Sequence, residues 1–373
     1  MPVPTLSVTD YADPLNARIL AVSEDRITGF VREPFLAIAE QSGVPVETVL
    51  ERIAAMLAAG TIRRVRQTLI ATNLADGALV AWRVPGDLLD AAFDFLLKND
   101  PFTGHVVLRS AEPGAAGADY QLWTTLTVPA GVSMETHCAL LGRRIGAEDF
   151  QLMPALGVFA LGVGHVRRLK IAPGQKTACP ATMVRPHIEA LDAQEWRVLL
   201  AIKREFAVAE IRLNPWEGRA REVGLSLEAF CAMAESLAQR GVLGRFSTFL
   251  EHVKPASATG RAVTQHNGLF HWAVPAGREE EAGGEIGRHE ILTHCYWREG
   301  GPTFGHSNIM AVCHGTSKAR TLEHKAAIDA HLAACGIPVR YSTVFWGARS
   351  EIKPSEVSPE VYREWLERMR REG

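Results

Sequence analysis

Hydrophobic positions recur with the period of an α-helix in two stretches of the chain that share the same order of elements. In residues 33–65 the pattern predicts a helix, a turn at Ser42 and Gly43, a second helix that ends at Gly60, and entry into a strand. Residues 195–241 repeat this order. Each stretch is therefore predicted to be a helix-turn-helix unit followed by a short β wing.

The two stretches also match position by position. Residues 34–67 align without a gap with residues 215–248, so that Arg64 falls on Arg245. The chain thus contains the same module twice. Shared architecture with diverged chemistry favours a division of labour, in which one copy carries the active groups and the other supports it.

A strand-rich region follows each helix-turn-helix unit. In the first copy the periodicity predicts the order strand, helix, strand, strand, helix, strand. The predicted segments are 77–84, 87–98, 104–110, 120–128, 134–145 and 151–161. This order is typical of a ferredoxin-like βαββαβ sandwich with helices on one face of its sheet. We therefore predict an α+β fold, a tandem repeat of winged helix-turn-helix plus ferredoxin-like domain.

The second copy retraces the same order of strands and helices. Its first predicted strand is 269–274, and the segments that follow the first helix are 291–297, 308–314, 321–335 and 339–345. The first helix, around residues 278–287, is the weakest element because it is acidic and rich in glycine. Trp82 and Trp272 occupy equivalent strand positions, and we expect both in the core.

These patterns set the expected domain boundaries. Residues 171–186 are rich in proline and glycine at their start and are interpreted as a linker, and 362–371 as a charged helix on the surface. The expected parts are an N-terminal arm with a helix-turn-helix (1–66), a ferredoxin-like domain (67–170), a linker (171–190), a second helix-turn-helix (191–250), a second ferredoxin-like domain (251–350) and a C-terminal helical tail (351–373).

Composition narrows the classes of function. The chain has 373 residues, 47% of them hydrophobic, which is ample for two or three packed domains. The net charge of −2 provides no basic field that would favour nucleic acid. We find no apolar run long enough to span a membrane and no N-terminal signal pattern, so we expect a cytoplasmic protein. The six cysteines form no Cys-x-x-Cys pair, which argues against a cysteine-based metal site.

One row of polar side chains stands out in the second copy. His294, Tyr296 and Arg298 alternate along a predicted strand and should point to one face of the sheet. They form either the solvent-facing side of an edge strand or the floor of a polar cleft. Asn308 and His314 would lie on one face of the neighbouring strand. A pocket with these groups would suit a ligand with several carboxylates.

Other histidines and arginines are further candidates. His105 aligns with His294, and Arg109 aligns with Arg298, so the first copy is a candidate second contributor. Nine of the 13 histidines follow residue 250, which favours a site in the second half. His252, beside the second wing, could reach over the sheet. No His-x-x-x-His or acidic pair indicates a metal held by the protein.

Short motifs in this order resemble those of a known family. A helix-turn-helix followed by βαββαβ resembles the Lrp/AsnC regulators. Residues 120–129, Tyr-Gln-Leu-Trp-Thr-Thr-Leu-Thr-Val-Pro, resemble a signature of the sirohaem (siroheme) decarboxylases, as do His294-Cys295-Tyr296-x-Arg298 with Asn308 after it and the Tyr-Ser-Thr that begins at Tyr341.

The resemblance implies an activity and an assembly. Members of this family remove two acetate carboxyl groups as CO2 from sirohaem to give 12,18-didecarboxysirohaem on a route to haem or haem d1. No organic cofactor is implied, because the iron belongs to the substrate. The enzymes combine two Lrp-like subunits, separate or fused. We therefore expect an intramolecular pseudo-dimer that binds a tetrapyrrole, with a homodimer or a related subunit as a further partner.

The same resemblance assigns roles to individual residues. We expect His294 to donate a proton to the carbon that loses CO2, Arg298 to clamp a neighbouring carboxylate, and Tyr296 to orient either one. The residues expected to bind substrate are Asn308, His314, His252, His105, Arg109, Arg245 and Tyr341.

The chain departs from the family pattern at several positions. After Tyr-Ser-Thr the family continues with Arg-Glu-Phe-Lys, whereas this chain has Val344-Phe345-Trp346-Gly347. Val107 stands where the first copy would carry the motif tyrosine. Two alternatives stay open: a DNA-binding regulator of the Lrp/AsnC type, and a tetrapyrrole-binding partner subunit without activity. The exposed acidic residues expected on the second helix of each helix-turn-helix argue against the regulator.

Overall fold

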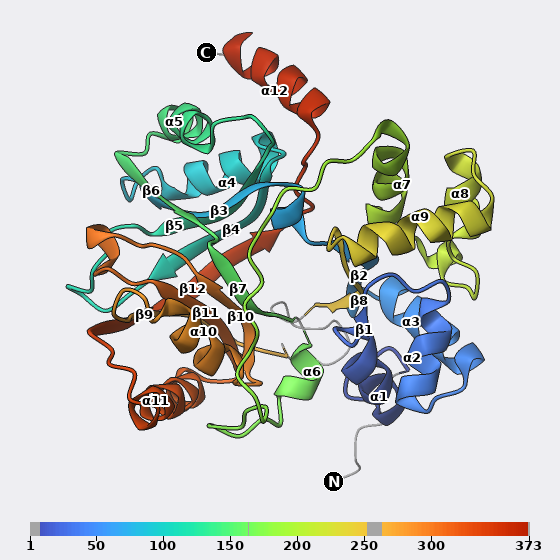
Figure 1. Cartoon of the computed structure of the whole chain (residues 1–373), viewed down its shortest axis with the longest axis horizontal. Coiled ribbons are helices and arrows are strands. Elements are labelled where there is room, and N and C mark those ends of the chain that lie inside the picture. The colour runs from blue at the N-terminus through green and yellow to red at the C-terminus, as the bar shows by residue number, and fades with distance from the viewer. Residues whose placement is uncertain (1–7, 163, 252–262, 372–373) are drawn as a thin grey trace. The chain divides into compact units, whose positions relative to one another are not determined.

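The computed structural model describes residues 8–162, 164–251 and 263–371, which form two compact units (Figure 1). The first unit comprises Met1–Ile70, Gly162–Ile171 and Glu189–Gln265, and the second comprises Ala71–Leu161, Ala172–Ile188 and His266–Gly373. Like elements of the two sequence copies are therefore grouped together. Both helix-turn-helix copies lie in the first unit, and both ferredoxin-like copies lie in the second. No helix in the described residues is long and apolar enough to cross a membrane.

The helix-turn-helix unit has the elements that the hydrophobic pattern predicts. The first copy consists of α2 (Pro34–Ser42), α3 (Val46–Ala58) and β2 (Ile62–Leu69), and the second of α8 (Glu217–Glu222), α9 (Leu227–Gln239) and β8 (Leu243–Leu250). Gly43 ends α2 in the left-handed conformation at φ 64°, which glycine adopts without strain. Three elements were not predicted from the sequence: α1 (Pro14–Ser23), β1 (Ile27–Thr28) and α6 (His165–Arg168). A further helix, α7 (Ala193–Lys203), precedes the second copy.

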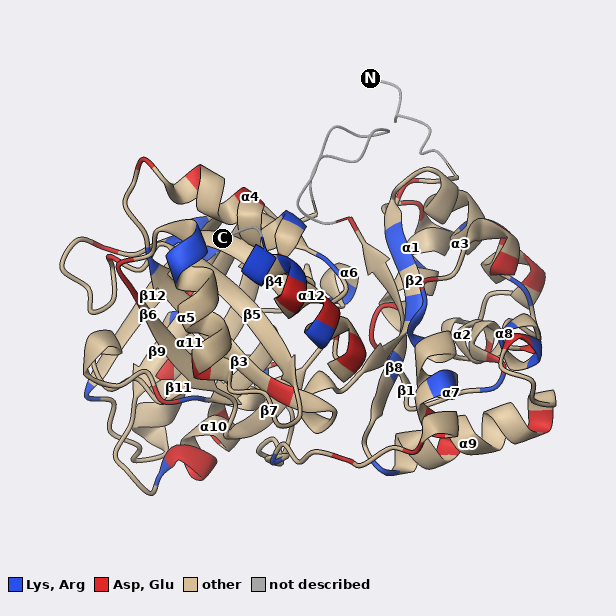
Figure 2. Ribbon diagram, turned by 90° about the horizontal axis from the view of Figure 1, so that it is seen from above, with Lys and Arg blue, Asp and Glu red and all other residues tan. Residues whose placement is uncertain are grey.

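The wing strands of the two copies pair with each other. β8 lies in the centre of a three-stranded antiparallel sheet, between β1 and β2. Phe35, Phe206, Trp216 and Phe246 pack together beneath this sheet. Basic residues follow β2 along its length (Figure 2).

The first half of the ferredoxin-like unit follows the predicted order with one correction. Its elements are β3 (Ala75–Arg83), α4 (Leu89–Asn99), β4 (Thr103–Ser110), β5 (Leu122–Pro129), α5 (Met134–Ile145), β6 (Asp149–Pro154) and β7 (Gly157–Leu161). The last segment was predicted as one strand, 151–161, and it is two. Pro154 has no amide N–H to donate, and after it the chain leaves β3 to pair with another strand.

The second half has the same order. Its elements are β9 (His266–Ala273), α10 (Glu279–Gly287), β10 (Leu292–Trp297), β11 (Ile309–Gly315), α11 (Lys318–Ala334) and β12 (Tyr341–Ile352). The glycine-rich α10 does form, because tertiary contacts override its weak propensity: it packs on β10 and β11. Trp82 and Trp272 are both fully buried, as predicted.

The two halves share a single sheet. The strand order is β6-β3-β5-β4-β12-β9-β11-β10-β7. The first part of β12 pairs with β9 of its own half, and its second part pairs with β4 of the other half. In the same way, β6 pairs with β3 while β7 crosses to β10. The expected pairing of the two ferredoxin-like copies within one chain is therefore confirmed, and it occurs by exchange of the last strands.

Each half presents one face to helices and the other to its counterpart. Helices α4 and α5 cover the face of the first half that contains Trp82, and α10 and α11 cover the second half (Figure 1). The opposite faces meet in a cluster with residues of both halves: Ala81, Val107, Tyr120, Trp123, Met153, Leu269, Phe304, Met310 and Phe345. We call this the inner face. Alternation along each strand decides which side chains reach it.

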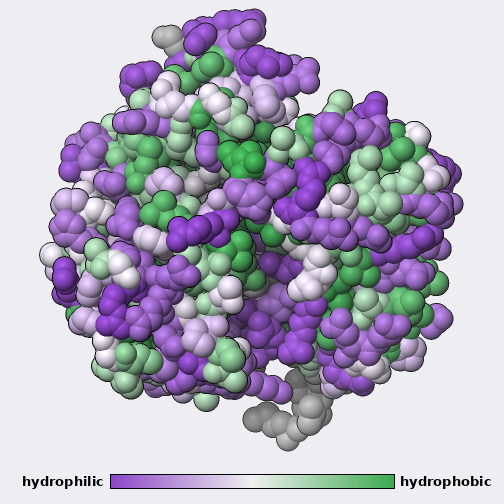
Figure 3. All heavy atoms as spheres, in the orientation of Figure 1, coloured by the Kyte–Doolittle hydropathy of each residue, from purple (hydrophilic) through white to green (hydrophobic). Residues whose placement is uncertain are grey.

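The chain ends in α12 (Pro359–Arg371), which packs on the first half. The sequence predicted a surface helix, and its outer side is hydrophilic (Figure 3). Its inner side is buried: Tyr362 and Trp365 pack against Phe102 and His137. The indole Nε1 of Trp365 donates to the Asn99 carbonyl at 2.8 Å.

The close fit of β7 against α10 generates a prediction. A Cβ atom at Gly283 would lie 2.1 Å from the ring of Phe159, so Gly283→Ala should lower the free energy of unfolding by about 1–3 kcal/mol. In the double variant with Phe159→Ala, the combined loss should be clearly smaller than the sum of the single losses, measured by urea unfolding. Gly142→Ala is the control, because its Cβ would meet only ordinary contacts of 3.7 Å or more. If the losses of the two single variants simply add in the double variant, Gly283 and Phe159 are not in close contact.

Candidate functional site

The polar row on β10 is assembled as the alternation predicted. The rings of His294 and Tyr296 stack with their centroids 6.1 Å apart and their planes 15° from parallel. The guanidinium carbon of Arg298 lies 4.5 Å from the centre of the Tyr296 ring. Cys295 points the other way, with its Sγ 3.8 Å from the Gly283 carbonyl on α10. The three polar side chains therefore share the face that is turned away from the helices.

This row is not the solvent-facing side of an edge strand. β10 has a partner on each side, β11 and β7. Arg298 is 7% exposed, and His294 and Tyr296 are half-buried. The row therefore lies on an interior strand of the sheet and is at least half-buried. Thr293 Oγ1 lies 3.1 Å from His294 Nδ1, which fixes the orientation of the imidazole.

Arg298 is a buried cation without a carboxylate partner among the described residues. Its Nη1 donates to the carbonyl of Met153, on β6 of the other half. Burial lowers the pKa of the guanidinium, and contact with Tyr296 offsets part of this effect. A buried charge that lacks a counter-charge is costly, and a bound carboxylate would relieve the cost. This corner of the inner face is therefore suited to an anion.

Arg109 occupies the equivalent place in the first half. Its Nη1 donates to the Phe345 carbonyl and to Asn267 Oδ1, each at 3.3 Å, and the side chain is 6% exposed. Burial lowers its pKa to about 10. Nearby on β4, His105 Nε2 lies 2.8 Å from Ser350 Oγ. Each arginine thus binds a carbonyl near the end of the opposite half, which gives the unit an approximate two-fold arrangement.

Asn308 is engaged by the fold in this structure. Its Oδ1 accepts from the Val274 amide at 2.9 Å, and its Nδ2 donates to the Val274 carbonyl at 3.0 Å and to Glu279 Oε1 at 3.2 Å. These bonds tie the end of β9 to α10. His314 follows Met310 and Val312 on the inner-face side of β11 and is half-buried.

The remaining expected substrate residues are scattered. The Tyr341 hydroxyl accepts from the Ala116 amide at 2.9 Å and so holds the loop between β4 and β5. Arg245 lies on β8 of the helix-turn-helix unit, not in the ferredoxin-like unit. His252 lies outside the described residues.

One residue of the inner face was not singled out from the sequence. His271 on β9 is fully buried, with its ring 4.8 Å from that of Phe345 and 5.9 Å from those of Trp123 and Phe304. Neither ring nitrogen has a hydrogen-bond partner, and burial lowers the pKa of the imidazole to about 3, helped by the charge of Arg109. The signal in the sequence was the alignment of His271 with Ala81.

Two histidines of α11 face the interior or a neighbouring helix. His324 is buried, which lowers its pKa to about 4. His331 Nε2 lies 2.5 Å from Glu285 Oε2, and Cys335 Sγ lies 3.7 Å from the same nitrogen. These three residues are the one group in the described part of the chain whose ligand atoms are close enough for a metal ion.

The charges around this trio explain it without a metal. Arg288 Nη1 contacts the same Glu285 oxygen at 3.0 Å, and Lys176 Nζ lies 3.2 Å from His331 Nδ1. Two cations beside the cluster disfavour a third. Glu285 thus pairs with His331 and Arg288, and Lys176 bonds to His331, so the group is a polar network that joins α10 to α11.

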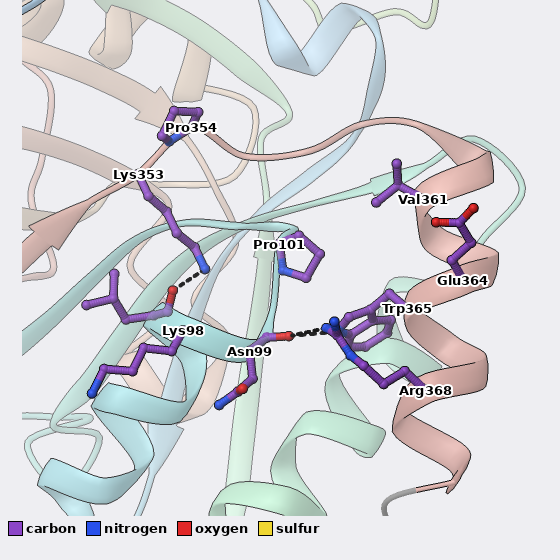
Figure 4. A pocket seen from close by; sticks show the side chains of 10 residues that line it. Lys98, Asn99, Pro101, Lys353, Pro354, Val361, Glu364, Trp365 and Arg368 are labelled. Atoms are coloured by element: carbon purple, nitrogen blue, oxygen red, sulfur yellow. Dashed lines mark hydrogen bonds between the residues drawn. The ribbon is translucent and has the colours of Figure 1, made fainter.

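A groove of about 560 Å³ opens between the end of α4, the end of β12 and α12 (Figure 4). Lys353 lies in its wall, but its Nζ donates to the carbonyls of Leu96, Leu97 and Asp100 and so caps α4. Trp365 and Arg368 hold α12 to the Asn99 carbonyl. The groove lies on the helix-covered side of the first half, opposite the inner face, and results from the docking of α12.

Comparison with known protein families detects the same domain twice in this chain, once in each ferredoxin-like half. The family model described as AsnC-like ligand binding domain matches twice, at residues 74–159 and 264–343. These segments cover most of the two ferredoxin-like halves.

The chain is similar to proteins named siroheme decarboxylase. The siroheme decarboxylase of Hydrogenobacter thermophilus is 26% identical over 307 residues, covering 80% of this chain and 85% of that protein. The siroheme decarboxylase NirH subunit of Paracoccus pantotrophus is 31% identical over 131 residues, covering 35% of this chain and 77% of the subunit. The crystal structure of the siroheme decarboxylase NirDL shares the fold, with a TM-score of 0.64 and 22% identity, covering 94% of this chain and 96% of that one. The structure of NirDL in complex with an iron-uroporphyrin III analogue gives a TM-score of 0.63 and 20% identity, covering 96% of this chain and 99% of that one.

The buried neutral imidazole of His271 makes stability depend on pH. In the unfolded chain a histidine has a pKa near 6.5, whereas burial lowers that of His271 to about 3 and that of His324 to about 4. Protonation therefore favours unfolding, so this stability is complete above about pH 6.5 and is lost as the pH falls towards the folded values. Each of the two histidines should contribute up to about 1.4 kcal/mol per pH unit to the slope of the free energy of unfolding against pH.

Urea unfolding between about pH 6.5 and pH 5 measures this slope. We expect the slope to become smaller in His271→Leu and, independently, in His324→Leu, and smallest in the double variant. Substitution of the exposed His187 is the control and should leave the slope unchanged. A slope that stays at the wild-type value in both single variants would show that neither imidazole is held neutral.

Proposed function

Because the chain belongs to the sirohaem decarboxylase family, we propose that it is a carboxy-lyase that removes acetate carboxyl groups from sirohaem and forms 12,18-didecarboxysirohaem on a route to haem or haem d1. The observation that carries this proposal is the row of His294, Tyr296 and Arg298 on the inner face, with a buried guanidinium that lacks a carboxylate partner among the described residues. The likeness to a structure that holds an iron-uroporphyrin III analogue supports it.

The reaction needs a proton at carbon. When the bond between the acetate CH2 and its carboxylate breaks, CO2 leaves and its electron pair stays on the CH2 carbon. One proton on that carbon then gives a methyl group, so each step consumes one proton and releases one CO2. Histidine is the side chain best suited to deliver a proton near neutral pH. We assign this role to His294.

The neighbours of His294 would position the substrate. Tyr296 stacks on the imidazole and lies beneath the guanidinium of Arg298, so it holds the two groups in register. Arg298 would bind a carboxylate next to the one that reacts. No organic cofactor is needed, because the iron is part of the substrate.

The pseudo-dimer supplies both halves of the enzyme in one chain. Separate related subunits are known by name among the relatives, such as NirH of Paracoccus pantotrophus. Here β7 and β12 already exchange between the two halves, which supports an intramolecular assembly. Six free cysteines fit a reducing compartment, and we propose the cytoplasm.

A DNA-binding regulator is the weaker alternative. The second helix of each helix-turn-helix exposes acidic residues, Glu47 and Glu51 on α3 and Glu228 and Glu235 on α9. These would repel phosphates. The wing strands β2 and β8 pair with each other, with Arg66 opposite Ser247.

Anaerobic incubation with sirohaem tests the activity. Mass spectrometry of the wild-type reaction should show a product that has lost one and then two molecules of CO2. His294→Ala should lower the rate about 10²- to 10⁴-fold while sirohaem still binds, because the proton donor is lost and the carboxylate contacts remain. His187→Ala, an exposed histidine of the connecting segment, is the control. Binding without CO2 loss in the wild type would make the chain a tetrapyrrole-binding subunit, and near-normal turnover in His294→Ala would remove the assigned role.

A further inference from the structure

A second polar corner of the inner face surrounds Arg109. In the sheet register, Arg109 on β4 lies opposite Gly347 on β12, and Gly347 lies opposite Asn267 on β9. Glycine leaves the middle position without a side chain. The Arg109 guanidinium therefore reaches across β12 to Asn267 Oδ1, at 3.3 Å.

The hydrogen bonds of Arg109 are incomplete. Nη1 is shared between Asn267 Oδ1 and the Phe345 carbonyl, both at the long distance of 3.3 Å. Nε is buried and has no partner. No carboxylate of the described residues pairs with this guanidinium, and burial alone accounts for its lowered pKa. Arg109 is thus a buried cation whose donors are only partly used.

His271 lies at the same corner and is also unsatisfied. Its ring packs 4.8 Å from the ring of Phe345, the residue whose carbonyl binds Arg109. Both of its ring nitrogens are buried without a hydrogen-bond partner. Two neighbouring buried groups with unused polar atoms are costly, because each has lost its hydration without a replacement.

Two other buried arginines have carboxylate partners. Arg219, 1% exposed, donates to Glu210 and to the carbonyls of Ala201, Ile202, Arg204 and Glu205. Arg168 is paired with Asp25 at 3.0 Å. Arg109 differs from these two arginines because no carboxylate of the described residues pairs with it.

The corner lies close to the surface. Asn267, Gly347 and Ser350 are half-buried, and so is His105, whose Nε2 contacts Ser350 Oγ at 2.8 Å. An acetate or propionate arm could enter between them without the whole ligand entering the core. Asn267 and His271 of the second copy align with Gly77 and Ala81 of the first copy. These two polar side chains are therefore present in the second copy only.

We propose that Arg109, Asn267 and His271 form a second carboxylate-binding subsite, separate from the row of His294, Tyr296 and Arg298, which receives one carboxylate arm of the tetrapyrrole. The inference rests on the proposed function for the identity of the ligand. The guanidinium supplies charge and N–H donors, and the Asn267 amide and the N–H of the neutral imidazole supply further donors. The carboxylate neutralises the buried cation.

Stability of the ligand-free protein tests the first half of this argument. Arg109→Met and His271→Leu replace unsatisfied polar groups with apolar ones, so their melting temperatures should equal or exceed that of the wild type. Arg219→Met is the matched control, and it should lower the melting temperature because it removes a fully bonded buried arginine. Melting temperatures of Arg109→Met and His271→Leu that both fall as far as that of Arg219→Met would overturn the proposal, since both residues would then be structural.

Ligand binding tests the second half, with iron uroporphyrin and iron coproporphyrin titrated by absorbance. Both probes carry propionate arms, but coproporphyrin has methyl groups in place of the acetates. Arg109→Met should weaken binding of iron uroporphyrin about 10- to 100-fold, and His271→Leu should weaken it by a smaller factor. An equal loss for both probes assigns a propionate to the subsite, and a loss for iron uroporphyrin alone assigns an acetate.

Unchanged affinity of both variants for both probes would overturn the subsite. This outcome is distinct from failure of the proposed function, which is read from CO2 release by the wild type. If the wild type binds iron uroporphyrin through Arg109 and His271 but releases no CO2 from sirohaem, the subsite stands and the decarboxylase activity falls.

Discussion

Exchange of the last strands between the two halves is the interaction on which the ferredoxin-like unit depends. The backbone of β12 bonds first to β9 and then to β4, and β7 returns the exchange at β10. Each half therefore completes the sheet of the other. Arg109 binds the Phe345 carbonyl on the exchanged strand β12, and Arg298 binds the Met153 carbonyl on β6, just before the exchanged strand β7, so each polar corner combines groups of the two halves. Neither corner exists in one half alone.

Most of the fold could be predicted because hydrophobic residues recur along the chain with a clear helical or strand period. Helical spacing located α2, α3, α9 and α5 closely, and the order of strands gave the βαββαβ topology. The helix α1 was missed, and the break after Pro154 was not recognised. Local periodicity reports which face of a strand is apolar, but it does not report which strand pairs with which. The pairing of β2 with β8 and of β7 with β10 is a tertiary property.

The site was predictable in part for the same reason. Alternation placed His294, Tyr296 and Arg298 on one face, and the structure brings them into contact. Sequence alone could not show that the Asn308 amide is used to hold β9, or that Arg245 belongs to the other unit. His271 was overlooked because a single histidine in an apolar strand has no pattern. Only the orphaned nitrogens, visible in three dimensions, set it apart.

The order of strands has a consequence for how copies of this chain can meet. A sheet ordinarily ends in strands whose unpaired backbone groups invite another strand. Here the two outermost strands, β6 and β7, are separated by only Ala155 and Leu156, and they are six and five residues long. The outer side of β7 is also bridged by Val184. Little open backbone remains at β7, so self-association that extends the nine-stranded sheet from this edge is disfavoured.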